Sequence, residues 1–504
     1  MAFPSTVVFV HGWSVRNTST YGELPERLRS EAAARGAELD VRHVWLGKYV
    51  SFRDEVRVPD LARAFEAALR KELGPSLDAG ARFACITHST GGPVVREWWQ
   101  RFYLAPEATC PMSHLVMLAP ANFGSALAQL GKSRLSRVKT WFQGVEPGTG
   151  VLDWLELGSP ESWELNREWI GQSADVVESS GVFPFVLTGQ TIDRKLYDHI
   201  VSYSGEAGSD GVVRVAAANL NATYVRLEQE PWTLAGGKPE APKLSTAERV
   251  AAPATAFKIV PGRAHSGSSI GIIRSVKDDG EPHPTVEAVL RCFEVSTVAE
   301  YEALRQAFAA ENPVTQDEER VEVARGLVMR GTTYITDRYS MVIFRVRDDR
   351  GGAISEFDLK LTATPATQPD RKPTADLLPP GFFQDRQLNR RAPNTLTYFL
   401  DSDAMLGAPP AEHDGETMRP EMPGAAKLGF QVEPHLTSGL VHFLPAELQA
   451  AAEMLEQVVK PNQTTLVDIV LRRVVREGAF RLVTLGQRKD TDFSKDPPGD
   501  PIPQ

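Results

Sequence analysis

Three polar residues along the chain carry the side chains that nucleophilic catalysis needs. Ser89 lies in "ITHSTGG", Asp210 in "GSDGVVRV" and His265 in "PGRAHSGS". A serine hydroxyl is a weak nucleophile, so it requires a histidine that takes its proton and a carboxylate that orients this histidine. The three residues therefore predict acyl transfer through a covalent intermediate on Ser89, with His265 as the base and Asp210 as the acid.

Other residues compete for these roles. Asp210 precedes a glycine, which is also the common use of aspartate in turns, and serine followed by glycines is an ordinary way to end a strand. His283 lies in "GEPHPTV" at the entrance of a predicted helix, which favours a capping or loop role. The rival acids are Asp193 and Asp198, and the rival bases are His199 and His283.

The elements around these residues predict a layered α/β sheet from residue 6 to about 295. The predicted strands are 6–10, 40–47, 82–87, 114–120, 182–189, 222–230 and 256–262, and the predicted helices are 21–36, 58–74, 92–104 and 285–295. Ser89 then stands at a sharp turn between a buried strand and a helix whose N-terminal dipole favours negative charge. Gly91 is the small neighbour that the strained backbone of such a turn needs.

Four segments, "VHGW", "THSTGG", "SDGVV" and "AHSG", occur in this order and resemble the lipase and esterase branch of the α/β-hydrolase superfamily. The resemblance covers residues 1 to about 295, and "LAPANFGSALA" at 118–128 is similar to the stretch after the sixth strand in lipases. Thr87 stands where the G-x-S-x-G motif of the family has its first glycine. Some of these lipases have a calcium-binding aspartate just after the histidine, but "HSGS" has none, so neither a metal nor a cofactor is expected.

The family's order of serine, acid and histidine implies the same three roles for Ser89, Asp210 and His265. The resemblance also implies an oxyanion hole, formed by the main-chain N–H groups of Trp13 and Thr90. His11 is then a structural residue of the first loop.

An insertion at 122–180 separates two predicted strands and holds four of the nine tryptophans of the chain. One interpretation is a satellite helical subdomain with a small core of its own. The other is a lid, because amphipathic helices rich in tryptophan suit a flap that covers an acyl pocket and settles on lipid.

The rest of the chain has a different pattern. Residues 296–324 predict a helical linker, and residues 325–488 contain short strands separated by turns, which predicts an antiparallel β-sandwich-like domain. We expect this domain to be non-catalytic, either docking to a lipid surface or protein partner or packing against residues 1–295. The Asp- and Pro-rich tail at 489–504 is predicted to be disordered.

Composition excludes several classes of protein. The net charge is −10 and the basic residues are scattered, so nucleic acid is not an expected partner. The three cysteines form no C-x-x-C pair, which predicts neither a disulfide framework nor a zinc ribbon. No apolar run reaches the roughly 18 to 20 residues that cross a bilayer. No signal peptide is recognised, so we expect cytoplasmic synthesis, with signal-independent export such as type VI secretion as the alternative.

Together these features predict a serine hydrolase of carboxylic esters, of the lipase or phospholipase kind, acting on a lipid or ester substrate. Peripheral membrane contact is expected through the lid or the β domain. An acyltransferase would share every residue named, and a binding protein that retains the hydrolase scaffold is an alternative from another class.

Overall fold

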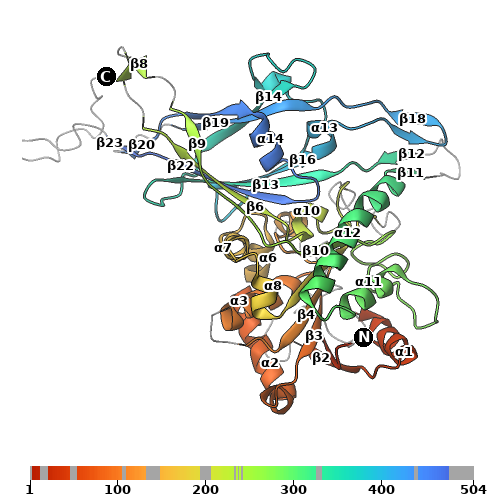
Figure 1. The fold of residues 1–504 in the computed structure, drawn as a ribbon. Coiled ribbons are helices and arrows are strands. Elements are labelled where there is room, and N and C mark those ends of the chain that lie inside the picture. Colours follow the sequence, from red (N-terminus) through yellow and green to blue (C-terminus); the bar gives the residue numbers. More distant parts are fainter. Residues whose placement is uncertain are drawn as a thin grey trace, which may run out of the picture.

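The computed structural model describes residues 3–11, 21–45, 54–104, 109–131, 148–192, 206–231, 234–235, 238–239, 242–324, 332–435 and 441–475. The described chain forms two stacked units, each built on a six-stranded sheet (Figure 1). We call them the parallel-sheet unit, from the described parts of 3–222 and 252–318, and the mixed-sheet unit, from those of 223–251 and 332–475.

The first sheet has the strand order β10-β5-β4-β3-β1-β2, and all of its pairings are parallel. Its strands are β1 (Thr6–His11), β2 (Asp40–Trp45), β3 (Phe83–His88), β4 (Met112–Leu118), β5 (Phe183–Thr188) and β10 (Ala256–Ile259). Every residue of β5 is buried, as expected for a parallel sheet that is covered on both faces. The structure confirms the predicted α/β arrangement.

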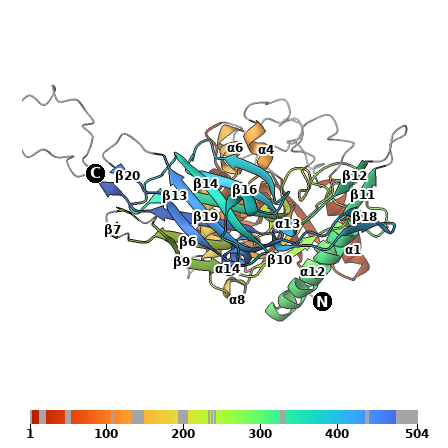
Figure 2. The same ribbon diagram turned by 90° about the horizontal axis from the view of Figure 1, so that it is seen from above.

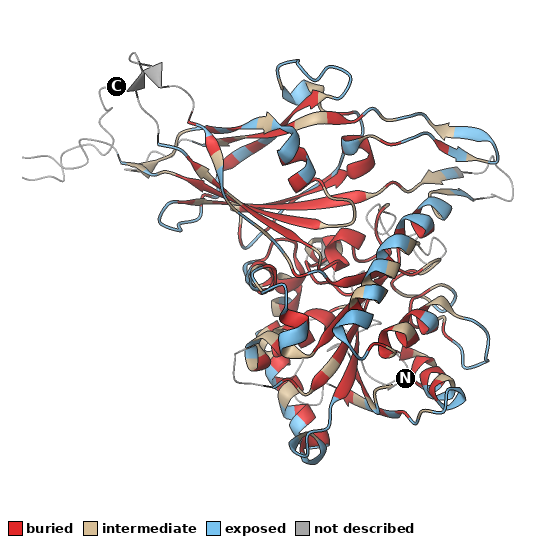
Figure 3. Ribbon diagram, viewed as in Figure 1, coloured by how far each residue is buried: buried red, intermediate tan, exposed pale blue. Residues whose placement is uncertain are grey.

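Helices cover both faces of this sheet (Figure 3). They include α1 (Leu24–Ala34), α2 (Val58–Asp78), α3 (Gly91–Tyr103) and α11 (Pro284–Phe293), whereas the short α4 (Ala126–Gly131) packs on the inserted helices described below. In α2, Leu61, Phe65, Leu69 and Leu73 repeat at helical spacing, and all four are buried. The spacing of apolar residues thus determines which face of the helix meets the core.

The predicted linker is a long helix, α12 (Val298–Glu318), that is attached to the edge of the first sheet. The Tyr301 hydroxyl donates a hydrogen bond to the Pro184 carbonyl oxygen at 2.7 Å and accepts one from Ala256 N at 3.0 Å. The Asn312 side chain accepts from Ile259 N at 2.8 Å and donates to the Phe257 carbonyl at 2.9 Å. These bonds satisfy the free edge of β10, so α12 is a part of the parallel-sheet unit.

The second sheet has the order β15-β16-β13-β22-β6-β9 and lies against the three-stranded antiparallel sheet β14-β19-β21. The strands are β6 (Thr223–Gln229), β9 (Leu244–Ala251), β13 (Tyr339–Asp348), β14 (Phe357–Pro365), β15 (Phe383–Leu388), β16 (Thr395–Asp401), β19 (Ala425–Pro434), β21 (Ala446–Ala451) and β22 (Thr464–Leu471). From above, β14 and β19 lie across β13 and β16 (Figure 2), and apolar side chains of both layers form a separate core. The sandwich-like fold is confirmed, but the larger sheet is mixed, because β22 pairs in parallel with both β13 and β6.

One predicted strand belongs to the other unit. The strand expected at 222–230 in the first sheet is β6, which pairs with β22 and β9 in the second. The Tyr224 hydroxyl of β6 also bonds to the Asp468 carboxylate of β22 at 3.1 Å. The expected division of the chain at residue 295 is therefore wrong here, because the alternation within a strand sets its buried face and does not select its partner strand.

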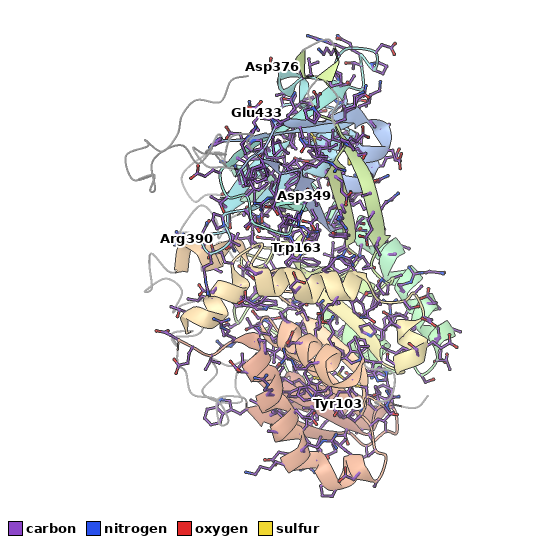
Figure 4. All side chains as sticks on the ribbon, turned by 90° about the vertical axis from the view of Figure 1, so that its left-hand side faces the viewer. Tyr103, Trp163, Asp349, Asp376, Arg390 and Glu433 are labelled. Carbon is purple, nitrogen blue, oxygen red and sulfur yellow. The ribbon has the colours of Figure 1, made fainter. Side chains whose placement is uncertain are left out.

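The described part of the insertion is a packed layer between the two sheets. Its helices are α6 (Thr149–Leu155), α7 (Pro160–Ile170) and α8 (Val176–Ser180). Trp154, Trp163 and Trp169 are all buried. Trp169 packs on Trp99 of α3, with ring centroids 5.7 Å apart, and the Arg345 guanidinium of β13 lies 4.3 Å from the centre of the Trp163 ring. Figure 4 shows Trp163 at the level where the two units meet.

This burial argues against a lid formed by α6–α8, because all three tryptophans are at most 2% exposed and have no face left for lipid. The alternative interpretation, a satellite helical subdomain with a small core of its own, also differs from the structure, because the apolar side chains of α6–α8 belong to the same core as the first sheet. Trp141 and the rest of 132–147 lie outside the described residues. No described helix has both the length and the apolar character of a membrane span.

Candidate active site

Ser89 occupies the turn between β3 and α3 with a strained backbone. Its φ is 53°, a left-handed conformation that non-glycine residues rarely adopt. The turn is held by bonds from Ser89 N to the Leu118 carbonyl at 3.1 Å and from Gly92 N to the Ser89 carbonyl at 3.2 Å. A Cβ at Gly92 would lie 2.7 Å from Pro120 Cβ, and one at Gly91 would lie 3.3 Å from Thr87 Cβ. Small residues are thus needed at both positions, and more strictly at Gly92 than at the predicted Gly91.

The structure brings His265 and Asp210 to this serine. His265 Nε2 lies 3.1 Å from Ser89 Oγ, and His265 Nδ1 lies 2.9 Å from Asp210 Oδ2. The other carboxylate oxygen of Asp210 accepts hydrogen bonds from Val212 N at 3.0 Å and Val213 N at 2.7 Å. The side chain of Asp210 is fully buried and that of His265 is almost so. The arrangement forms one continuous hydrogen-bonded series from hydroxyl to imidazole to carboxylate.

The rival candidates fall into two groups. Asp193, Asp198 and His199 lie outside the described residues. His283 caps α11 as the sequence indicates, because its Nδ1 accepts a hydrogen bond from Thr285 N at 3.2 Å. Burial lowers the pKa of His283 to about 4, which keeps its ring neutral and able to accept this bond.

Of the two residues expected to donate to the oxyanion, the structure describes Thr90 but not Trp13. Thr90 is the N-cap residue of α3, directly after Ser89. The first N–H groups of a helix have no partner within the helix and are available to an anion. Trp13 and the side chain of His11 lie outside the described residues, so the second donor and the structural role of His11 remain predictions.

His88, immediately before the serine, contacts the histidine loop. Its Nε2 lies 3.2 Å from the carbonyl oxygen of His265, and the two imidazole rings are 4.8 Å apart. Burial lowers the pKa of His88 to about 3, so the ring is neutral and its Nε2–H donates to this carbonyl. Sequence reasoning assigned no role to His88, and its position beside the serine was the only available signal.

Glu319, at the end of α12, fixes the start of the same loop. Its carboxylate accepts from Gly262 N at 2.6 Å and from Gln190 Nε2 at 3.0 Å. Nearby, a Cβ on Gly189 would lie 1.8 Å from the Arg263 carbonyl oxygen, so the loop after β5 needs glycine there. The segment predicted as a linker therefore holds the loop that carries His265. The sequence did not reveal this contact, because Glu319 is far from His265 along the chain.

These side chains can transfer a proton from Ser89 to His265 while Asp210 stabilises the imidazolium. Within the described ranges, no cluster of histidine, cysteine and acidic residues has the arrangement of a metal site. The geometry is suited to acyl transfer through a serine ester.

Comparison with solved structures finds a relative that is similar over nearly the whole chain. The structure of phospholipase PlaB from Legionella pneumophila is 41% identical in sequence, covers 96% of this chain and 97% of its own, and superposes with a TM-score of 0.82. The structure of the same protein in complex with thio-NAD covers 99% of this chain and 100% of its own, at 41% identity and a TM-score of 0.81. No protein-family model and no curated protein sequence matches the chain.

Proposed function

This chain belongs to the α/β-hydrolase superfamily and to the family of phospholipase PlaB, and we propose that it hydrolyses the carboxylic esters of phospholipids. Similarity over nearly the whole of both chains supports an ester hydrolase of the phospholipase type. The observation that carries the mechanism is the hydrogen-bonded series Ser89–His265–Asp210, with distances of 3.1 and 2.9 Å.

In the proposed mechanism, His265 Nε2 takes the proton of Ser89 as Oγ attacks the ester carbonyl carbon. The N–H groups of Thr90 and Trp13 stabilise the oxyanion of the tetrahedral intermediate. The intermediate collapses to an acyl-enzyme, and His265 returns the proton to the departing lysophospholipid alcohol. Water, activated by the same histidine, then releases the fatty acid and restores Ser89.

Active-site labelling and product analysis test this proposal together. A fluorophosphonate should label the wild-type protein and should not label Ser89→Ala. Mixed phospholipid should yield free fatty acid and lysophospholipid in equal amounts. An acyl ester of an added alcohol in place of fatty acid would indicate the acyltransferase. The absence of both labelling and products would indicate a binding protein.

The acid is tested by exchanging the two candidates separately. Asp210→Asn should lower kcat by about 10⁴, because the base loses the group that orients it. Asp193→Asn is the matched control and should keep kcat near the wild-type value. The opposite outcome would transfer the role to Asp193.

We also propose that the mixed-sheet unit contacts the lipid surface through apolar side chains that it exposes. Phe383 and Leu388 on the edge strand β15 are each 42% exposed. Leu388→Ser should weaken sedimentation with phosphatidylcholine vesicles and leave turnover of a short soluble ester unchanged. Val314→Ser, at an exposed valine of α12 in the other unit, is the control. Equal vesicle binding by both variants would contradict contact at β15.

A further inference from the structure

The loop that carries Asp210 is tightly bonded to itself. Ser209 Oγ donates to the Glu206 carbonyl at 2.7 Å and accepts from Gly211 N at 3.1 Å. Val215 N closes the loop with a hydrogen bond to the Gly208 carbonyl at 2.9 Å. A loop with this many internal bonds moves as one body, so the position of Asp210 depends on what holds the loop from outside.

Arg214 connects this loop to the mixed-sheet unit. Its side chain is 1% exposed, and it donates to both carboxylate oxygens of Glu206, at 2.9 and 2.8 Å. The same guanidinium donates to Asp385 Oδ2 of β15 at 2.5 Å, and Gln387 Nε2 donates to this oxygen at 2.9 Å. One buried cation therefore joins an acid within the loop to an acid in the other unit.

Two aromatic rings of the mixed-sheet unit complete the contact. The centre of the Phe399 ring on β16 lies 4.1 Å from the Arg214 guanidinium carbon. Tyr339 of β13 stacks on Phe399 with ring centroids 4.9 Å apart. Tyr339 also packs so closely on Gly208 that a Cβ there would lie 2.2 Å from the ring. The loop thus rests on an aromatic surface formed by two strands of the second sheet.

The segment after the loop is fixed in the same way. Helix α10 (Val215–Ala218) lies beneath β13 and β6 (Figure 1). Thr464 Oγ1 of β22 donates to the Ala216 carbonyl at 2.8 Å. From the parallel-sheet unit, Ser125 Oγ bonds to the Val212 carbonyl at 2.6 Å. The Asp385 carboxylate that pairs with Arg214 and both aromatic rings, however, belong to the mixed-sheet unit.

We propose that Arg214, Asp385, Phe399 and Tyr339 are positioning residues that hold Asp210 against His265, so that the mixed-sheet unit is required for turnover. The inference rests on the proposed function, because it takes Asp210 as the acid of the site. A displacement of about 1 Å in a catalytic group can cost on the order of 100-fold in rate. A buried arginine that loses one of its carboxylate partners repacks or recruits water, which moves the loop.

The first test is the kinetics of Asp385→Asn, with active sites counted by fluorophosphonate labelling. We expect kcat per labelled site to fall on the order of 10- to 100-fold, with KM for a short ester within about twofold, because Asp210 acts on His265 in the proposed mechanism. A folded variant with wild-type kcat overturns the proposal.

Asp468→Asn is the matched control. Asp468 is a fully buried carboxylate of β22 that pairs with Arg345 at 3.0 Å and Arg347 at 2.7 Å. Its hydrogen-bond partners Tyr224, Arg345 and Arg347 lie on β6 and β13, away from the loop of Asp210. We expect a lower melting temperature and an unchanged kcat per labelled site. A fall in kcat equal to that of Asp385→Asn would show a general effect of stability and would overturn the proposal.

A double-mutant cycle with Asp210→Asn separates positioning from an independent effect. If Asp385 acts through Asp210, then Asp385→Asn should lower kcat by less than about twofold when Asp210 is already asparagine. The same fold-loss in both backgrounds overturns the proposal. Wild-type kcat in Asp210→Asn alone would instead refute the proposed acid, whatever Asp385 does.

Phe399→Leu supplies a second variant if Asp385→Asn does not fold. Leucine keeps the site apolar but removes the aromatic face beneath the guanidinium. Phe399→Leu should likewise lower kcat by less than about twofold when Asp210 is already asparagine. The same fold-loss in both backgrounds would overturn the proposal.

Discussion

The two sheets of this protein are of equal size and are built from different kinds of contact. In the parallel sheet, β1, β2 and β3 are each followed by a helix that packs on the sheet, and Ser89 and His265 stand on loops after β3 and β10. The mixed sheet combines β6 and β9 with strands from beyond residue 338. The first sheet therefore forms largely from neighbours in sequence, and the second forms only when distant segments meet.

The two units therefore have different tasks at the site: one carries the reactive groups, and the other helps to hold one of them in place. Ser89 and His265 are presented by loops of the parallel-sheet unit. The loop of Asp210 lies where the chain crosses between the units, and it contacts β13, β15 and β16. In our proposal, the mixed-sheet unit thus controls the geometry of a site whose serine and histidine lie in the other unit.

The largest effect is expected from separating the units. The sequence pattern alone predicts that a chain truncated after residue 297 still hydrolyses soluble esters. In the structure this truncation removes β22, the partner of β6, and also α12, which covers the edge of β10. We therefore expect insoluble protein without labelling by a fluorophosphonate. Soluble protein with substantial ester hydrolysis would contradict the dependence of one unit on the other.

The next largest effect is confined to the parallel-sheet unit. Ser89→Ala should reduce kcat by about 10⁴ or more, because the nucleophile, base and acid act as a unit. Its melting temperature should stay close to the wild-type value. Ser30→Ala, at an exposed serine of α1, is the control and should retain full activity. Activity of Ser89→Ala within tenfold of wild type would remove Ser89 from its role.

A smaller effect is expected at His88, which donates a hydrogen bond to the loop that carries His265. His88→Ala removes the donor to the His265 carbonyl and leaves a gap beside the His265 ring. We expect kcat to fall on the order of 10-fold. His88→Gln keeps an N–H donor and should recover part of the loss. Equal kcat for both variants and wild type would show that the base loop needs no such support.

The smallest effect is a difference in pH dependence between the units. Burial lowers the pKa of His114 in the parallel-sheet unit to about 4, whereas the pKa of a histidine in the unfolded chain is about 6.5. The unfolded state therefore binds more protons, and stability is lost as the pH falls from about 6.5 towards 4. Burial raises the pKa of Asp401 in the mixed-sheet unit to about 7. The pH dependence of stability due to Asp401 therefore has the opposite sign, and its contribution to stability is lost as the pH rises through about 7.

Chemical denaturation at several pH values measures both contributions. His114→Gln should lose less stability than wild type between pH 6.5 and pH 4. The difference in the free energy of unfolding between Asp401→Asn and wild type should favour the variant more at pH 8 than at pH 5. Asparagine stays neutral at both pH values and can still cap α13 (Ser402–Leu406). If the free energy of unfolding of a variant and of wild type changed in parallel with pH, this would contradict the pKa shift at that residue.

Much of the site could be predicted from the sequence because its signals are local. A strand of apolar residues, a turn of small residues and a helix of 3.6 periodicity follow one another around Ser89. His265 and Asp210 are also recognised by the turns that surround them. These patterns indicated the residues that the structure brings within hydrogen-bonding distance.

Only the tertiary structure decided which sheet β6 joins, what buries Trp163 and what holds Arg214. Each depends on residues far away in sequence, such as Asp468 for Tyr224 and Asp385 for Arg214. Alternation marks the buried face of a strand and helical periodicity that of a helix, but neither pattern identifies the segment that covers the face. The sequence by itself therefore determined the local elements and the types of the reactive groups, and long-range packing determined the partners that position them.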